Sequence, residues 1–328
     1  MTRVLALALS AIAALQLLAM PITGANARPL EITARPVPLN YTAPEQLRMG
    51  RLVWRGGIDL GSPSIRFGGF SGLLVTSDRS KLTALNDEGY WITATITYDA
   101  DGFLTGLSNG QASPLRDTNG KPLRGKTDQD AEAMAETADG SILVAFERNH
   151  RIWRYPPGEA PLSGNAEPLP APDGLADLPE NNGVEAMATL AGDSILAIAE
   201  GEDDDTVTPA FLWRDGTWSR LRYQRFGNYR PADAARLPTG DLLVVERRYT
   251  VLEGVGIRIV RIPASTIVPG ALLQPVEIAR LLPPLSIDNM EGISIRQNDR
   301  GETIIYLISD DNFNIVQRTL LLMFALEE

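Results

Sequence analysis

The sequence predicts an all-β fold, a β-propeller of five or six four-stranded blades closed by a strand from near the N-terminus. Two observations predict it. An apolar run, a turn and a second apolar run rich in β-branched residues return together five times, and the copies begin 48 to 61 residues apart. A period of this length has room for four short strands and their turns, which is typical of propeller blades.

Each copy begins and ends with a carboxylate or a small polar side chain. The copies begin at Ser71, Glu132, Glu185, Asp233 and Glu291. Their second runs end at Asn86 with Asp87, Glu147, Glu200, Glu246, and Ser309 with Asp310 and Asp311. The turns between the runs contain Gly, Asp and Asn, which accept the positive φ angles of tight hairpins. Each copy therefore predicts a β-hairpin, and later runs such as RIWRY and GIRIVRI supply the outer strands.

The last copy is too short for a whole blade. From Glu291 to the C-terminus there is room for about three strands, so we expect LVWRGGIDL, residues 52–60, to complete that sheet. Such closure removes exposed sheet edges. The copies number five, although the stretches outside them leave room for a degenerate sixth blade. Residues 28–50 are rich in proline and could form either an added strand or a loose arm.

The first 27 residues predict a secretory signal peptide. Arg3 precedes an apolar core, and the small residues Ala25 and Ala27 precede the expected cleavage point. The alternative is a retained membrane anchor, which the short apolar stretch, broken by Pro21 and Gly24, disfavours. We expect residues 28–328 to form a single propeller domain in the periplasm or outside the cell.

The composition excludes several classes of site and partner. Loss of residues 1–27 removes Arg3 and moves the formal charge from −11 to −12, so neither nucleic acid nor a membrane is an expected partner of the cleaved protein. Without cysteine there are no disulfides, thiolate metal sites or cysteine nucleophiles. The single histidine, His150, rules out a three-histidine zinc site, and we interpret it as a turn residue. No GxSxG motif supports a Ser-His-Asp triad.

The hairpins place the polar ends of all five copies at one rim. Successive strands of a blade are antiparallel, so the start of the innermost strand and the end of the next lie at the same mouth of the central channel. Carboxylates gathered there would raise one another's pKa values unless cations neutralise them. Hard oxygen ligands in such numbers suit Ca²⁺, which is the cofactor that we predict.

Further charged residues stand next to the ends of the copies. NDEG and SDDNFN add ligand types, and GEDDD, residues 201–205, is either a solvated acidic loop or part of a metal site. Arg148, Arg247 and Arg248 follow acidic strand ends and could hold an anionic or ester substrate, or could pair with neighbouring carboxylates. Lys126 and Arg318 are further candidates. We expect the glycines around Phe70 to let backbone segments approach one another closely near the axis. We expect Trp153, Trp213 and Trp218 to pack between blades.

The order of these motifs resembles the phytase-like family, also described as esterase-like activity of phytase. The resemblance is carried by FGGFSGL with NDEG, DAEAM with FER, NNGVEAMA with AIAEG, LVVERRY, DNMEGI and LISDDNFN. It covers about residues 50 to 325 and implies an exported propeller that hydrolyses phosphoesters or esters with calcium. By analogy Glu132, Glu185, Glu291, Asp310, Asp311 and the NDEG residue Asp87 would be metal ligands. Glu147 or Glu200 would be a ligand or base, and Arg148 or Arg247 a phosphate clamp.

Three functions remain open on the sequence alone. The first is a calcium-dependent phosphoesterase, and the second is a non-enzymatic propeller that binds a ligand or partner protein and is stabilised by calcium. The third is a metal-dependent lactonase or carboxylesterase.

Overall fold

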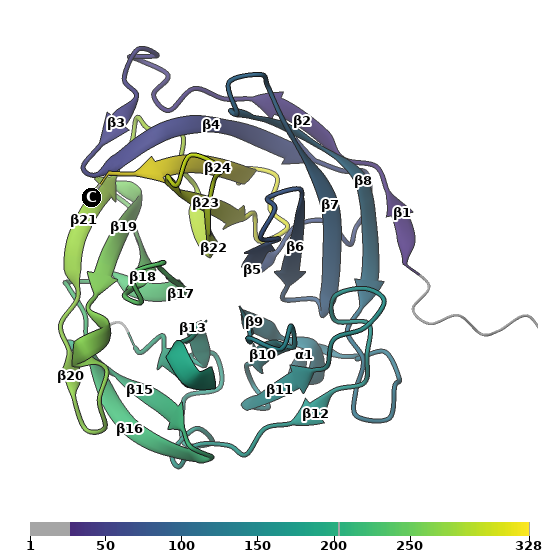
Figure 1. The fold of residues 1–328 in the computed structure, drawn as a ribbon, viewed down its shortest axis with the longest axis vertical. Coiled ribbons are helices and arrows are strands. Elements are labelled where there is room, and N and C mark those ends of the chain that lie inside the picture. Colours follow the sequence, from purple (N-terminus) through teal and green to yellow (C-terminus); the bar gives the residue numbers. More distant parts are fainter. Residues whose placement is uncertain (1–26, 203, 328) are drawn as a thin grey trace, which may run out of the picture.

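The computed structural model describes residues 27–202 and 204–327, which form five antiparallel blades around a central axis (Figure 1). The predicted signal peptide lies outside the described residues, apart from Ala27. No helix in the described part of the chain has the length and apolarity that crossing a membrane requires.

The first three blades follow one another along the chain. The first consists of β5 (Phe70–Val75), β6 (Lys81–Asn86), β7 (Tyr90–Tyr98) and β8 (Leu104–Pro114), with β1 (Arg28–Leu30) at its edge. The second consists of β9 (Ala131–Glu136), β10 (Ile142–Phe146), β11 (Arg151–Tyr155) and β12 (Glu167–Pro168). The third consists of β13 (Val184–Thr189), β14 (Ile195–Ala199), β15 (Val207–Arg214) and β16 (Thr217–Gln224). A short strand, β20 (Leu272–Leu273), pairs in parallel with β16.

The last two blades differ in how they are completed. The fourth consists of β17 (Arg230–Arg236), β18 (Leu242–Thr250), β19 (Gly254–Ile262) and β21 (Val276–Leu281). The fifth consists of β22 (Asn289–Gln297), β23 (Thr303–Asp310), β24 (Thr319–Leu326) and β4 (Leu52–Gly61). Two short strands, β2 (Thr33–Pro36) and β3 (Arg48–Met49), pair with β4. Short helical turns occur at α1 (Lys126–Gln129), η1 (Ala191–Asp193) and η2 (Ala264–Thr266).

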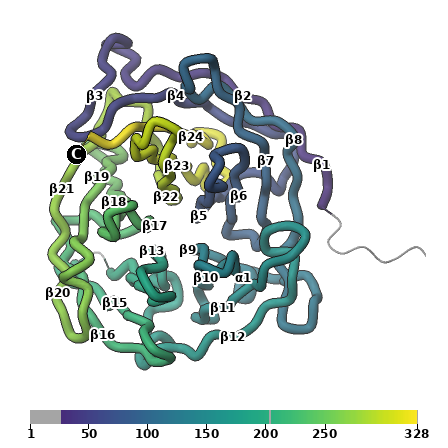
Figure 2. The backbone as a smooth tube through the Cα atoms, in the orientation of Figure 1, coloured from purple at the N-terminus to yellow at the C-terminus, as the bar shows by residue number. Residues whose placement is uncertain are grey.

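The N-terminal strand closes the ring, as the sequence predicts. Figure 2 shows β4, near the N-terminal end of the tube, running alongside the C-terminal β24. The segments that left room for a sixth blade form β1, β2, β3 and β4 instead, so the propeller has five blades. The innermost strands contact one another in a circle, in the order β5, β9, β13, β17, β22 and again β5.

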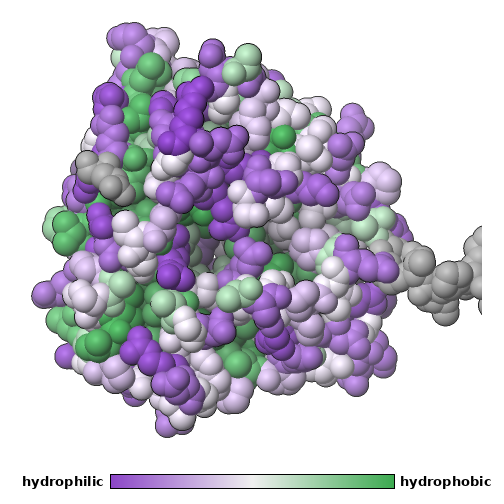
Figure 3. Space-filling view, in the orientation of Figure 1, coloured by the Kyte–Doolittle hydropathy of each residue, from purple (hydrophilic) through white to green (hydrophobic). Residues whose placement is uncertain are grey.

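The core lies between the blades. Successive side chains point to opposite faces of each sheet, and apolar residues on both faces pack against neighbouring sheets. Trp153 packs into the cluster between the first two blades, and Trp213 with Trp218 packs into the one between the second and third, as expected. The outer surface is mostly hydrophilic on the face shown in Figure 3, which is hollowed near its centre.

Weakening the closing strand should destabilise the whole ring. Ile58 of β4 is completely buried and pairs with Leu321 of β24. We expect Ile58→Ala to lower the free energy of unfolding by about 2–5 kcal/mol, because it leaves a cavity in the core. Urea denaturation measures this change. Val276→Ala, at an exposed position of β21, is the matched control and should change stability by no more than about 0.5 kcal/mol.

Candidate functional site

Each innermost strand carries a β-bulge just after its start. In the first blade Phe70 pairs with Asn86 and Gly72 with Leu85, so that Ser71 has no partner of its own. The same shift of register occurs in the other four blades. The five bulged residues are therefore equivalent positions: Ser71, Glu132, Glu185, Ala232 and Glu291. Because a bulge changes the direction of a side chain, it can turn these residues toward the axis.

The pairing also defines equivalent positions at the ends of the second strands. In the first blade the backbone N–H of Asp87 donates to the carbonyl of Gly69, two residues before the bulge, at 3.0 Å. In each of the other blades, the corresponding residue likewise pairs across the hairpin with the residue two positions before the bulged residue. These strand-end residues are Asp87, Glu147, Glu200, Arg247 and Asp310.

Apart from Ala232, the two sets of side chains line one cavity of about 170 Å³ at the mouth of the propeller. Its charged lining consists of seven carboxylates and one guanidinium, which belong to Asp87, Glu132, Glu147, Glu185, Glu200, Glu291, Asp310 and Arg247. Ser71, Asn181 and Asn312 add neutral polar groups. The predicted gathering of acidic residues at one mouth is thus present in the structure.

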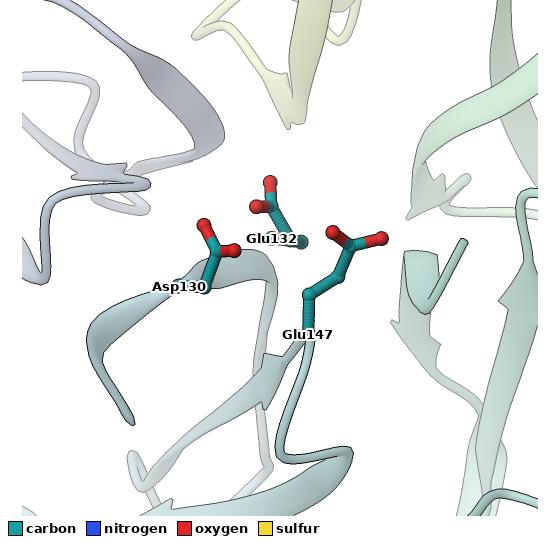
Figure 4. A group of neighbouring side chains, drawn as sticks. All are labelled: Asp130, Glu132 and Glu147. Carbon is teal, nitrogen blue, oxygen red and sulfur yellow. The ribbon is translucent and has the colours of Figure 1, made fainter. Parts of the chain in front are cut away.

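Two groups of three carboxylates come close enough to share a cation. Oxygens of Glu132, Glu185 and Glu291 lie within 4.8 Å of one another, and so do oxygens of Asp130, Glu132 and Glu147, which Figure 4 shows side by side. Ca²⁺ binds oxygens at about 2.3–2.6 Å, so oxygens around one ion are at most about 5 Å apart. The donor set therefore fits a hard divalent cation, and Glu132 could bridge two ions.

The cavity contains too few cationic side chains to neutralise its carboxylates. The pKa values of Glu132 and Glu185 lie well above the usual range, first because protein atoms surround both carboxylates and remove them from water, and second because neighbouring carboxylates repel the charged form. Burial raises the pKa of Glu147 to about 7 and that of Asp310 to about 8. No ion pair among the described residues includes Glu132 or Glu185. A bound cation would stabilise their ionised forms.

Arg247 supplies the internal positive charge that the cavity has. Its Nη2 lies 3.2 Å from Glu200 Oε1, and its Nε lies 2.8 Å from Glu291 Oε1. Burial lowers the pKa of this guanidinium, but the charges of Glu291 and Glu200 outweigh that effect and raise it. Arg230 lies 3.0 Å from the other oxygen of Glu200. The fourth blade thus contributes cations where the other blades contribute carboxylates.

Two residues that we expected at the mouth lie elsewhere. Asp233 follows the bulge instead of occupying it, and its buried carboxylate accepts the backbone N–H of Ile293 at 2.8 Å. Glu246 lies one residue before the strand-end position and is buried in an ion pair with Arg258, at 2.5 Å. The prediction for these two was wrong by one residue in each strand, because the equivalent positions of the fourth blade hold Ala232 and Arg247, and the acidic residues stand next to them.

Asp311 organises a loop and does not line the cavity. Its Oδ1 accepts the backbone N–H groups of Gly69 and Phe313, both at 3.0 Å, and its Oδ2 accepts the hydroxyl of Thr319 at 2.9 Å. A Cβ at Gly68 would lie 2.6 Å from Asp311 Oδ1, so this glycine permits the close approach that we expected. With its carboxylate engaged, Asp311 is left out of the ligand set proposed below.

The other basic candidates hold the rim together. Arg148 is paired with Asp130 at 2.7 Å and with Glu180 at 3.1 Å, and it does not line the cavity. Lys126 lies 2.6 Å from Asp87 and 2.7 Å from Asp130. Pairing with carboxylates, which we considered as the alternative to substrate binding, is therefore what the structure shows for both.

Two further basic candidates also face carboxylates. Arg248 is paired with Glu253 at 2.5 Å, and Arg318 lies 3.7 Å from Asp288. His150 lies in the turn between β10 and β11, with its Nε2 3.1 Å from the carbonyl oxygen of Pro179. Neither arginine lines the cavity.

Sequence reasoning missed several residues of the site. Asp130 belongs to one carboxylate group, and its position two residues before Glu132 in DQDAEAM could have indicated it. Arg230 was missed because it stands just before the repeat that we recognised. Asn181 lies in the long connection between the second and third blades, where no motif points to it.

Comparison with known families is consistent with this arrangement. The sequence matches the phytase-like family, described as esterase-like activity of phytase, over residues 65–313. The chain belongs to this family. The match includes all five hairpins that line the cavity of this phytase-like protein, from β5 to β23. No curated protein sequence matches the chain.

Solved structures resemble the chain in overall form only. A protein of unknown function from Dyadobacter fermentans is 13% identical, with a TM-score of 0.45, and covers 93% of this chain and 95% of its own. The PQQ-bound aldose sugar dehydrogenase from Streptomyces coelicolor is 13% identical, with a TM-score of 0.43 and coverages of 90% and 99%. A luciferin-regenerating enzyme is 10% identical, with a TM-score of 0.42 and coverages of 89% and 96%. Similarity at this level carries no functional argument.

The raised pKa values predict how pH and calcium affect stability. In the metal-free protein the folded state binds more protons than the unfolded chain, whose carboxyl pKa values are about 4. This contribution to stability is complete below about pH 4 and is lost as pH rises through the pKa of Glu147, about 7, and that of Asp310, about 8. We expect the Tm of chelator-treated protein to fall between pH 5 and pH 8.

Added calcium should reverse this loss, raising Tm more at pH 8 than at pH 5, because protons compete with the ion for the carboxylates. Scanning calorimetry at both pH values measures the effect. A Tm that is equally insensitive to calcium at pH 5 and pH 8 would contradict the assignment of the cavity as a cation site.

Proposed function

We propose that this phytase-like protein is a calcium-dependent ester hydrolase that acts on phosphoesters at the mouth of the propeller. The observation that supports it best is the pair of carboxylate groups that share Glu132, a residue that lines the small open cavity. When bound, calcium would supply the positive charge that attracts an ester or phosphate oxygen and offsets the charge that develops during hydrolysis.

The proposed ligands are the carboxylates of the two close groups and their neighbours in the cavity lining. Glu132, Glu185 and Glu291 would hold one ion, and Glu132 with Asp130 or Glu147 could hold another. Two other lining carboxylates, Asp87 and Asp310, are available to complete the coordination. Six to eight oxygens surround calcium in proteins, so the neutral groups of the cavity and water would complete the set.

Of the two candidate bases, Glu147 is the better placed. Glu200 is paired with both Arg230 and Arg247, so both of its carboxylate oxygens are already engaged. Glu147 has no such pair, and its Oε1 accepts the backbone N–H of Gly183 at 2.7 Å, which fixes its orientation.

Arg247 is the candidate group for orienting an anionic substrate. Its Nε and Nη2 face Glu291 and Glu200, whereas its Nη1 has no hydrogen-bond or ion-pair partner among the described residues. A phosphate oxygen could meet this nitrogen. Arg148 has two carboxylate partners and lies outside the cavity lining, so it supports the site by holding Asp130.

Export suits a protein that depends on calcium, because proteins outside the cytoplasm can use weak calcium sites with Kd values of about 10⁻⁴–10⁻³ M. The predicted signal peptide would place the protein in the periplasm or outside the cell.

The test is hydrolysis by purified, chelator-treated protein with and without added calcium. We expect calcium to restore phosphate release from p-nitrophenyl phosphate or phytate. Glu185→Gln and Asp310→Asn should each lower this activity at least about 100-fold, because each removes a proposed ligand. Asp193→Asn, at the opposite end of the same blade as Glu185, is the matched control and should keep full activity.

Other outcomes would assign the protein to the alternatives. Calcium-dependent hydrolysis of p-nitrophenyl acetate or lactones alone would identify a carboxylesterase or lactonase. A calcium-dependent Tm without turnover of any of these substrates would identify a binding protein and overturn the proposed activity. Circular dichroism of each variant shows whether a loss of activity reflects a loss of fold.

A further inference from the structure

The rim around the cavity exposes its most accessible pairs of apolar side chains on two loops of the fourth and fifth blades. In the turn between β18 and β19, Val251 is 90% and Leu252 is 97% exposed. In the loop between β23 and β24, Ile315 is 100% and Val316 is 79% exposed. Side chains of this kind on two neighbouring loops are unusual, because each could be replaced by a polar residue without loss to the core.

Both loops rise directly from the cavity. β18 continues for three residues past Arg247 before it turns, so the tip of its hairpin stands about 10 Å beyond the cavity wall. The second loop starts immediately after Asp310. At its base Phe313 lies against the backbone of Gly69, where an added Cβ would be 2.4 Å from the ring. Gly69, Arg247 and Asp310 all line the cavity, so the apolar loops are continuous with the site.

The same rim is polar on the second and third blades. The turn after Glu147 contains Arg148 and Asn149, and the segment after Glu200 contains Glu202 and further acidic residues. Among the described residues, no large apolar side chain is exposed in these two turns. The mouth is therefore amphipathic, with acidic groups toward the third blade and apolar groups over the fourth and fifth.

The size and charge of the cavity restrict what can enter it. Pockets that enclose a whole drug-sized ligand have volumes of about 300–1,000 Å³, whereas this cavity has about 170 Å³ and a polar lining. It can accept an ester or phosphate group but not a hydrocarbon chain. A polyphosphate would bring many negative charges to an acidic rim that carries few unpaired cations, which disfavours it relative to a substrate with a single phosphate or ester group.

From these observations we infer that the substrates are amphiphilic esters, in which one phosphoester or ester group enters the cavity and one hydrocarbon chain lies against the loop tips of the fourth and fifth blades. This inference rests on the proposed function and names its substrate class. The apolar tips would remove part of the chain from water, and the acidic cavity with its cations would bind the head.

A homologous series of n-alkyl phosphates tests the inference with the full-length mature protein in calcium. Below their aggregation concentrations, kcat/KM should rise from methyl to octyl phosphate by about twofold per methylene. Full transfer of one methylene from water to an apolar environment gives a roughly fourfold step. A chain with one side exposed to water should gain about half of that free energy, which corresponds to a roughly twofold step. The double variant Leu252→Ser/Ile315→Ser should flatten the series while methyl phosphate turnover stays unchanged.

The matched control places the same substitutions at the opposite rim. Val268 and Val276 are 46% and 61% exposed and lie at the far ends of the third and fourth blades, away from the cavity. Val268→Ser/Val276→Ser should leave the whole series unchanged. An equal loss in this control, or equal kcat/KM for methyl and octyl phosphate in the unmodified protein, would overturn the inference.

Binding of n-alkyl phosphonates, which cannot be hydrolysed, separates this inference from the proposed activity. If calorimetry shows that octylphosphonate binds at least about tenfold more tightly than methylphosphonate, and that Leu252→Ser/Ile315→Ser abolishes the difference, the amphiphile site stands even if no substrate is turned over. Association with phosphatidylcholine vesicles, without any preference among monomeric phosphonates, would assign the tips to a lipid surface and overturn the inference.

Discussion

The antiparallel pairing of β4 with β24 is the interaction on which the rest of the molecule depends. It joins the two ends of the chain in one blade and makes the five sheets a closed ring. The ring then forces residues from separate blades together: Glu132, Glu185 and Glu291 come from the second, third and fifth blades, yet their oxygens lie within 4.8 Å. In an open array the same side chains would face water separately, with ordinary pKa values.

Crowding at the axis explains why the fourth blade differs. With a carboxylate at every equivalent position, the cavity would hold still more negative charge in a partly buried space. The fourth blade places Ala232 at the bulge and Arg247 at the strand end, and Arg247 reaches the carboxylates of Glu200 and Glu291 on either side. A guanidinium suits this position because its fixed, planar nitrogens can face two carboxylates at once.

Much of the fold and of the site could be predicted from the sequence. The repeat gave five hairpins, the short last copy indicated an N-terminal closing strand, and antiparallel geometry placed Glu132, Glu185 and Glu291 at one mouth. These inferences succeeded because they rest on the period of the chain and on the direction of strands, which both survive local irregularity. The five-blade count needed the structure, because β1, β2 and β3 are short edge strands with little sequence signal.

The fourth copy shows where such reasoning stops. Asp233 and Glu246 are 13 residues apart, whereas Glu132 and Glu147 are 15 apart, and the true equivalents, Ala232 and Arg247, restore the spacing of 15. A bulge adds one residue to one strand, and the side-chain alternation then reverses on that strand. On the sequence alone, Asp233 and Glu246 were assigned to the ring because they are acidic like the residues at the ends of the other copies. Only the hydrogen-bonded register identifies an alanine and an arginine as the members of the ring.

The cation on one side of an otherwise acidic ring also gives the cavity a direction. Five equivalent blades alone would present nearly the same surface at every angle around the axis, so a bound molecule could rotate among several equal poses. Arg247 on one side and the carboxylates of Asp87 and Glu147 on others leave three distinct points of attachment. Three distinct points are enough to tell a chiral centre from its mirror image, so the two enantiomers of a chiral ester would meet unequal barriers in this pocket.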